Sequence, residues 1–274
     1  MGRVAVAQMV SRADVRANLS QVSELLAKAH AQDVQLIILP ENFAFMGKHE
    51  TDKLNIAERY GDGEIQQTIS RLARKYGMWI IAGTMPIQSA EARVRSSCLV
   101  YNEQGECKAR YDKIHLFDVR VSANEAHRES LTVEPGDDVV VVETPVGRIG
   151  LSVCYDLRFP ELYQQLRVNG AEIFSVPSAF TATTGAAHWE ILLRARAIEN
   201  LCYVLAANQG GQHENGRETY GYSMIVEPWG KVLAQQKREA GIVVADIDLS
   251  RIRQLRQQFP CHEHHVLTQN DLHR

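Results

Sequence analysis

The chain has 274 residues, of which 45% are hydrophobic and 23% charged, and its formal net charge is −3. This length and apolar content allow a sizeable core, while a near-neutral charge without a basic stripe argues against nucleic-acid binding. The longest apolar stretches have the length of strands, so we expect no membrane-spanning helix. The first residues enter a strand pattern directly, so we also expect no signal peptide.

Five cysteines stand at positions 98, 107, 154, 202 and 261, an odd number without Cys-x-x-Cys spacing. This usage argues against a disulfide framework or a zinc ribbon and predicts a reducing, cytoplasmic location. We expect Cys98, Cys107 and Cys202 to serve packing, because each lies in or beside an apolar strand run.

Strands and helices alternate in the first half of the chain. Helical spacing of apolar residues predicts helices at 14–31 and 65–76, the second ended by Gly77. Apolar runs predict strands at 4–7, 34–39, 78–83, 94–101 and 107–112. Residues 114–137 are polar and without periodicity, and so long a loop within a compact domain is usually functional.

The second half continues the alternation. Strands are predicted at 139–142, 148–153, 172–176, 202–207, 221–227, 231–235 and 242–247. Helices are predicted after Pro160 with Leu162, Leu166 and Val168 inward, at 186–200 with Ile191, Ala195 and Ile198 inward, and at 249–259. The pattern indicates one α/β domain over residues 1–274. Strands that are apolar on both faces suggest two packed sheets, although periodicity alone does not decide this.

Cys154 ends the strand run at 149–153, and Pro160 suits the first turn of the helix that follows. The thiol is therefore expected where a buried strand turns into a helix, beside unpaired backbone N–H groups. Such a position lowers the pKa of a thiol and supplies donors to an oxyanion. The alternative is a buried, inert cysteine.

Three charged residues stand at similar positions. Glu41 follows a buried strand run, Lys113 follows another, and Glu129 lies in the long loop. Each is also compatible with an ordinary solvated side chain. Together with Cys154 they make chemical sense, because a carboxylate activates a thiol and a lysine stabilises the resulting anions.

Four motifs carry a resemblance to a known family. They are Leu-Pro-Glu-Asn-Phe at 39–43, Tyr-Asp-Lys-Ile-His-Leu-Phe-Asp at 111–118, Arg-Glu-Ser at 128–130 and Val-Cys-Tyr-Asp-Leu-Arg-Phe-Pro-Glu-Leu at 153–162. In this order they resemble the nitrilase, or carbon–nitrogen hydrolase, superfamily. The resemblance implies a four-layer α-β-β-α sandwich, a homodimer that stacks two sandwiches, a small-molecule amide substrate, and no metal or organic cofactor.

The resemblance also implies roles for individual residues. Glu41 would be the general base, Lys113 the stabiliser of the oxyanion, and Cys154 the nucleophile. Glu129 would orient Lys113 and the substrate amide, and the backbone N–H of Tyr155 would complete the oxyanion hole. The implied cycle releases ammonia, passes through a thioester, and ends with hydrolysis to the acid.

Within the superfamily, residues 177–190, 194–199 and 220–230 resemble the Nit branch, which hydrolyses terminal amides of 2-oxo acids. Arg158 and Thr184 match positions expected to hold the carboxylate or keto end of the substrate, and arginine pairs bidentately with carboxylates. The alternative for Arg158 is a structural ion pair with Asp156 or Glu161. The run at 209–220 favours deaminated glutathione over the substrates of ω-amidases.

Other interpretations stay open. The chain could have another specificity of the superfamily, that of an ω-amidase, a nitrilase or a carbamoylase, or it could be a non-catalytic protein that keeps the fold and binds a partner. Several further residues are interpreted as structural: His262, His264 and His265 as a solvated tail, Trp189 and Trp229 as packing residues, and His188 as a satisfied histidine.

Overall fold

The computed structural model describes residues 1–90, 92–121, 126–264 and 266. One six-stranded sheet has the order β16-β1-β2-β3-β4-β5 and a second has the order β15-β14-β11-β10-β9-β8. The first contains β1 (Gly2–Gln8), β2 (Leu36–Ile38), β3 (Trp79–Gln88), β4 (Val94–Tyr101), β5 (Cys107–Asp112) and β16 (Gly241–Ile247). The second contains β8 (Val141–Thr144), β9 (Gly147–Leu151), β10 (Ile173–Ser175), β11 (Tyr203–Ala206), β14 (Met224–Val226) and β15 (Val232–Gln235).

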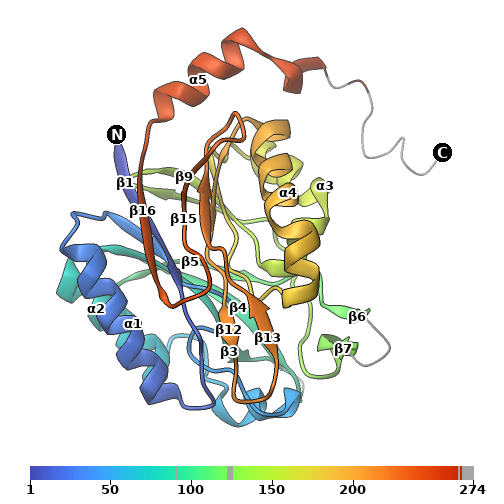
Figure 1. Cartoon of the computed structure of the whole chain (residues 1–274). Helices are drawn as coiled ribbons and strands as arrows, with labels where there is room; N and C mark the ends of the chain where they lie inside the picture. Colours follow the sequence, from blue (N-terminus) through green and yellow to red (C-terminus); the bar gives the residue numbers. More distant parts are fainter. Residues whose placement is uncertain (91, 122–125, 265, 267–274) are drawn as a thin grey trace.

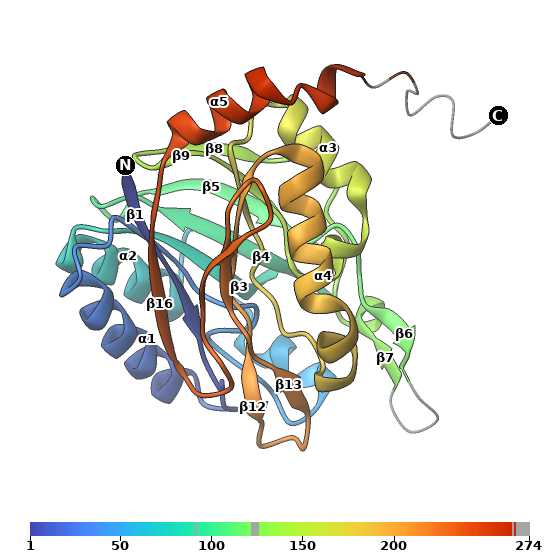
Figure 2. The same cartoon turned by 45° about the horizontal axis from the view of Figure 1, so that its top comes forward.

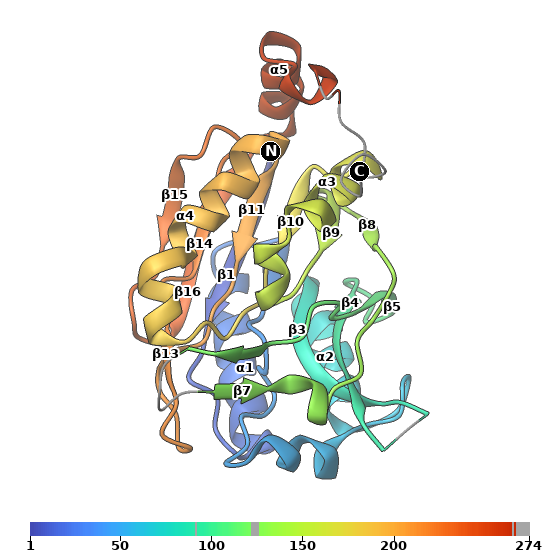
Figure 3. The ribbon, with the colours of Figure 1, turned by 90° about the vertical axis from the view of Figure 1, so that its right-hand side faces the viewer.

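Helices cover the outer faces of both sheets. Figure 1 shows α1 (Val15–His30) and α2 (Glu64–Tyr76) on one side, and α3 (Pro160–Val168) and α4 (Ala182–Asn200) on the other. The fifth helix, α5 (Leu249–Gln258), lies beyond one end of the sheets, as Figures 1 and 3 both show. The fold is therefore the four-layer α-β-β-α sandwich expected from the family resemblance.

Side-chain alternation in β1 explains the layering. Val4 and Val6 belong to the core cluster that joins both sheets, whereas Ala5 and Ala7 belong to the cluster shared with α1 and α2. Successive strand residues point to opposite faces, so a strand covered on both sides must be apolar throughout. This is why the buried strands appear in the sequence as continuous apolar runs.

Most predicted helix boundaries are confirmed by their caps. Gly77 ends α2 in the left-handed conformation with φ of 57°, and Pro160 occupies the first turn of α3. The helix predicted at 186–200 begins earlier, at Ala182, because the Thr181 side chain accepts a hydrogen bond from the Thr184 N–H and caps the new N-terminus.

Two segments hold more regular structure than the sequence indicates. The predicted loop at 114–137 contains β6 (Asp118–Arg120), β7 (Ala126–Arg128) and a 3₁₀ turn at Glu129–Leu131. The 209–220 run forms a second hairpin from β12 (Gly210–Gln212) and β13 (Glu218–Tyr220), which lies at the opposite end of the molecule from α5 in Figure 2. These strands have three residues each, too few for period-two alternation to be visible.

The predicted inner faces of two helices are partly wrong. Ile191 and Ile198 of α4 are 70% and 44% exposed, and Val168 of α3 is 72% exposed. In α4 the buried side is made by Trp189 and Leu193 instead. The helix carries apolar residues on more than one face, so helical spacing fits two orientations and only tertiary packing decides between them.

The cysteines, tryptophans and histidines that the sequence analysis interprets as structural differ in their burial. Cys98 and Cys202 are buried as expected, whereas Cys107 is exposed. Trp189 is buried, but Trp229 is half-exposed and packs edge-on against Phe259 at 5.6 Å between ring centroids. His262 and His264 form part of a 3₁₀ turn, and His265 lies outside the described residues. Among the described helices, none combines the length and apolarity needed to cross a bilayer.

Candidate active site

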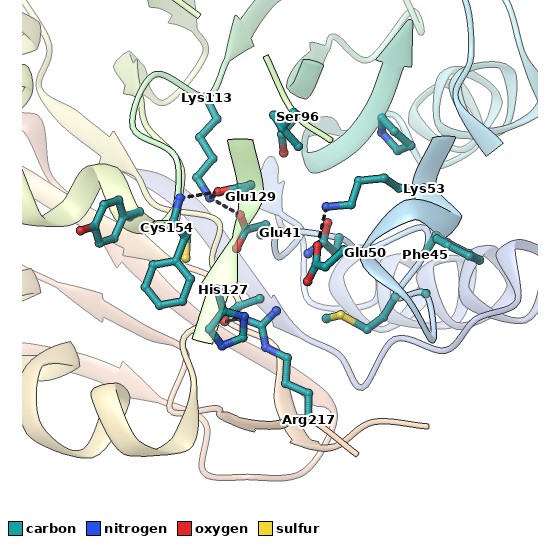
Figure 4. A pocket seen from close by; sticks show the side chains of 18 of the residues that line it. Glu41, Phe45, Glu50, Lys53, Ser96, Lys113, His127, Glu129, Cys154 and Arg217 are labelled. Atoms are coloured by element: carbon teal, nitrogen blue, oxygen red, sulfur yellow. Dashed lines mark hydrogen bonds and ion pairs between the residues drawn. The ribbon is translucent and has the colours of Figure 1, made fainter. Parts of the chain in front are cut away.

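The four predicted catalytic residues come from separate loops that meet at one pocket (Figure 4). Glu41 lies three residues beyond the end of β2, Lys113 directly follows β5, and Cys154 lies three residues beyond β9. Glu129 opens the 3₁₀ turn after β7. The structure therefore brings together residues that are up to 113 positions apart in the chain, since Glu41 and Cys154 line the same pocket.

The Lys113 ammonium lies between two carboxylates. Its Nζ is 2.8 Å from Glu41 Oε1 and 2.8 Å from Glu129 Oε2, and the lysine side chain is 2% exposed. Burial favours the neutral amine, but the charges of Glu129 and Glu41 outweigh it and hold the pKa of Lys113 well above its usual range. The lysine is therefore a permanent cation beside the sulfur.

Glu129 is fixed by more than the lysine. Its Oε2 accepts a 2.7 Å hydrogen bond from the backbone N–H of Phe117. Burial raises the pKa of Glu129, but Lys113, Lys53 and the Phe117 N–H more than offset it, so the net pKa is lowered. This carboxylate stays ionised, which suits it to hold the lysine in place.

Cys154 adopts the left-handed backbone conformation, with φ of 50°. Such a φ is uncommon outside glycine, and here the Cys154 N–H donates to the Pro177 carbonyl at 2.9 Å. The Asp156 N–H donates to the Val153 carbonyl. It is therefore paired, contrary to the expectation that the N–H groups after Cys154 are unpaired. The Tyr155 N–H has no acceptor within the described part of the chain and is available to a bound group.

The pKa of the Cys154 thiol is raised, contrary to the expectation of a lowered value. Burial is the main cause, and the negative charge of Glu41 adds to it. The Lys113 charge and the Ala179 backbone act in the opposite direction but do not prevail. The site therefore holds a neutral thiol near the Glu41 carboxylate.

Asp156 organises the turn that presents the thiol, a role that the sequence analysis missed. Its fully buried carboxylate accepts hydrogen bonds from the Val153 N–H at 2.8 Å, the Tyr111 hydroxyl at 2.6 Å and the His115 N–H at 3.0 Å. These donors belong to the Cys154 turn, to β5 and to the loop after Lys113. Asp156 thus ties the nucleophile turn to the lysine strand.

The predicted substrate-binding residues Tyr155, Arg158 and Thr184 all line the same pocket. The Arg158 guanidinium lies 5.7 Å from the Tyr155 ring centroid, and its Nη1 is 3.2 Å from His188 Nδ1. Within the described residues, Arg158 does not form the alternative ion pair with Asp156 or with Glu161.

Further pocket residues escaped the sequence analysis. They are polar or charged side chains from the loop after β2, from β7 and from the β12–β13 hairpin: Glu50, Lys53, His127, Asn215 and Arg217. For Asn215 and Arg217, the sequence offered one indication. The family resemblance linked residues 209–220 to substrate preference, but it did not show that this segment lines the pocket.

Comparisons with known proteins identify the family of the chain. The carbon-nitrogen hydrolase family model matches residues 3–257. The chain belongs to the carbon–nitrogen hydrolase family. It is 45% identical to the deaminated glutathione amidase of Yersinia enterocolitica over 95% of this chain and 92% of that protein, and 41% identical to the human protein of that name over 95% and 81%. The structure of the Caenorhabditis elegans NitFhit protein matches with a TM-score of 0.91 and 39% identity, covering 97% of this chain and 66% of that one.

The charge balance at this carbon–nitrogen hydrolase site yields a prediction about the thiol. Replacing Glu41 by Gln removes the negative charge that raises the pKa of Cys154, while the Lys113 cation remains. We expect the pH profile of Cys154 alkylation by iodoacetamide to shift downward by about one unit, which corresponds to roughly tenfold faster labelling at pH 8. Rates measured by mass spectrometry test this.

Glu50→Gln is the matched control, since Glu50 lines the pocket but is not among the groups that shift the Cys154 pKa. Its alkylation profile should equal that of the wild type. An unchanged profile for Glu41→Gln would contradict the assigned electrostatic balance.

Asp156 supplies a second prediction. Asn at this position keeps only one acceptor oxygen and turns an NH₂ group toward donors, so at least one buried hydrogen bond is lost. We expect Asp156→Asn to lower the free energy of unfolding in urea by about 1–3 kcal/mol. The exposed Asp246, whose carboxylate lies 3.7 Å from Arg3, is the control, and Asp246→Asn should change stability by less than about 0.5 kcal/mol. Equal effects would refute the organising role of Asp156.

Proposed function

We propose that the chain is a thiol-dependent amidase that hydrolyses deaminated glutathione. The observation that carries this proposal is the buried Lys113 ammonium held by Glu41 and Glu129 beside the Cys154 thiol. The identity of its relatives supports the substrate, because proteins named deaminated glutathione amidase match over almost the whole chain at 41–45% identity.

Glu41 acts as the general base in the first step. Its carboxylate lines the same pocket as the thiol and raises the pKa of that thiol, and it takes the proton as the sulfur attacks the amide carbonyl carbon. A new C–S bond forms, and the carbonyl π electrons move onto oxygen. Because the thiol pKa is raised, transfer of the proton to Glu41 is favourable only when the negative charge that develops on the carbonyl oxygen is stabilised by groups already in place.

Lys113 and the Tyr155 N–H stabilise that oxygen. The lysine is a cation that requires no rearrangement, and the Tyr155 N–H has no acceptor in the described structure. Preorganised donors of this kind stabilise an oxyanion more than the neutral carbonyl that precedes it. Glu129 holds Lys113 in place and accepts from the substrate amide.

Collapse of the tetrahedral intermediate breaks the C–N bond. The leaving nitrogen takes the proton held by Glu41, and a thioester of Cys154 remains. Water then attacks the thioester with Glu41 again as base, which releases the carboxylic acid and restores the thiol. No step uses a metal or an organic cofactor.

The leaving group differs from the one expected from the sequence. Glutathione is a tripeptide without a primary carboxamide, so its deaminated form is a 2-oxoglutaryl amide of cysteinylglycine. Hydrolysis of that amide releases cysteinylglycine and 2-oxoglutarate, whereas ammonia would arise only from a primary amide such as 2-oxoglutaramate. Arg158 and Thr184 are proposed to hold the 2-oxo acid end, since a guanidinium pairs bidentately with a carboxylate.

Substrate preference tests the proposal directly. We expect kcat/KM for the 2-oxoglutaryl amide of cysteinylglycine to exceed that for 2-oxoglutaramate, and Cys154→Ala to abolish both activities. Release of 2-oxoglutarate, coupled to a dehydrogenase, measures both reactions with one readout. Far-UV circular dichroism of the variant controls for folding. Equal or reversed preference would assign the chain to the ω-amidases, and no activity on any amide would overturn the proposal.

We further propose that the protein is a cytoplasmic homodimer of one domain over residues 1–274. Five unpaired cysteines support a reducing location. The outer layer that contains α4 carries exposed apolar side chains. Ile191 and Ile198 lie seven residues apart on α4, and Ile198 faces Gly230. Next to Gly230, Trp229 packs against Phe259. A contiguous apolar patch of this kind marks an interface.

The dimer makes a separate prediction. A charge in the centre of an apolar interface is desolvated without a partner, so Ile191→Glu combined with Ile198→Glu should convert the dimer to a monomer. Sedimentation would then give one 30.8 kDa chain instead of two. Arg71→Glu, on the exposed side of α2 at the other outer layer, is the control and should leave the dimer intact. A wild-type monomer would refute the proposal.

A further inference from the structure

The pocket continues outward from Cys154 to a mouth formed by three segments. These are the loop around residues 45–53, the strand β7 with His127, and the β12–β13 hairpin with Asn215 and Arg217. Figure 4 shows Arg217 beside His127, with the Glu50–Lys53 pair on the facing segment. The mouth therefore carries Arg217 and His127 together with the Glu50–Lys53 ion pair, and none of these groups takes part in the proposed chemistry.

The hairpin that carries Arg217 is firmly attached to the rest of the molecule. His213 is buried, with Nδ1 2.9 Å from the Ser11 carbonyl oxygen and Nε2 2.8 Å from the Thr219 hydroxyl. The Asn215 amide donates to the Gly47 carbonyl at 2.8 Å and joins the hairpin to the opposite lip of the pocket. Arg217 is thus held at a defined position rather than on a loose loop.

The Arg217 guanidinium has donors to spare. Among the described residues its one side-chain hydrogen bond runs from Nη2 to the Ala179 carbonyl oxygen at 2.9 Å, and its Nε–H is buried without an acceptor. Glu50 is near enough for the Arg217 charge to help lower its pKa, but its ion-pair partner is Lys53 at 3.1 Å. A buried guanidinium donor without a partner is costly unless a ligand supplies the acceptor.

Ala179 lies between this arginine and the sulfur. Its backbone helps to lower the pKa of the Cys154 thiol, and its carbonyl accepts a hydrogen bond from Arg217 Nη2 at 2.9 Å. The thiol and the guanidinium therefore line one pocket on either side of Ala179. Two extended peptide residues span about 7 Å, so a dipeptide leaving group attached to the acyl carbon extends from the sulfur toward Arg217.

We propose that Arg217 binds the terminal carboxylate of a dipeptide leaving group, so that the site selects acyl-peptide amides with a free C-terminus over primary amides. This inference rests on the proposed amidase function and adds the part of the substrate that departs. A guanidinium fork and a carboxylate form two parallel charge-assisted hydrogen bonds, which the free Nε–H of Arg217 is able to begin.

The test compares two substrates that differ only in charge at the far end. They are the 2-oxoglutaryl amides of cysteinylglycine and of cysteinylglycinamide, which share the acyl group and the scissile bond. For Arg217→Gln we expect kcat/KM to fall about 10- to 100-fold on the carboxylate substrate, with little change on the glycinamide. The wild type should discriminate between the two by a similar factor, and Arg217→Lys should recover part of the loss.

Arg158→Gln is the matched control, because Arg158 is assigned to the acyl end and its loss should lower kcat/KM on both substrates alike. Equal losses on both substrates for Arg217→Gln would mean a structural role through Ala179 and would overturn the inference, as would a wild type that does not discriminate.

If the wild type hydrolyses neither substrate, the proposed function fails and binding decides the inference instead. Calorimetry of Cys154→Ala with cysteinylglycine and with cysteinylglycinamide supports it if only the free carboxylate binds and Arg217→Gln removes that binding. Equal binding of both peptides, or of neither, refutes it.

Discussion

The structure depends on one buried cation between two carboxylates. A lysine that is 2% exposed is stable only with complete compensation, and removing one partner from such a cluster typically costs about 3–5 kcal/mol. Lys113 obtains this compensation from Glu41 and Glu129, whose loops begin at different strands. The requirement therefore works in both directions: the carboxylates keep the ammonium charged, and the ammonium fixes the loops that carry them.

The same cluster explains why a thiol with a raised pKa is compatible with nucleophilic catalysis. Glu41 and Lys113 shift the pKa of Cys154 in opposite directions, and burial raises this pKa, so that the neutral thiol is favoured. In the proposed mechanism, the negative charge appears on the substrate oxygen rather than on a free thiolate, and it appears where Lys113 already stands. Protonation at rest thus protects the sulfur, while the arrangement favours the transition state over the ground state.

The sequence predicts the strands of the two large sheets because buried strands require apolar residues on both faces, although some strand ends differ, as at β3, predicted at 78–83 and observed at Trp79–Gln88. Glu41, Lys113 and Cys154 each follow such a run, which leaves ordinary roles open, and the family motifs that contain them identify them as catalytic candidates. Asp156 could not be found in this way, since its donor Tyr111 lies 45 positions away and the strand register alone brings them together. The prediction of the inward face of α4 was wrong for a related reason. Ile191 and Leu193 are similarly apolar, and only packing against the neighbouring sheet determines which of them is buried.

In the proposed mechanism, chemistry and selectivity are carried by different parts of the fold. Glu41, Lys113 and Cys154 stand at or near the ends of strands of the two large sheets, whereas Arg217 directly precedes β13 of the two-stranded β12–β13 hairpin, which also bridges to Thr181 through Thr219. Ala179 lies between the two, beside the thiol and with its carbonyl on the arginine. Under this proposal, a change in the hairpin alters which amine departs without displacing the lysine cluster, and family members with the same reacting groups are able to differ in substrate through residues such as Arg217.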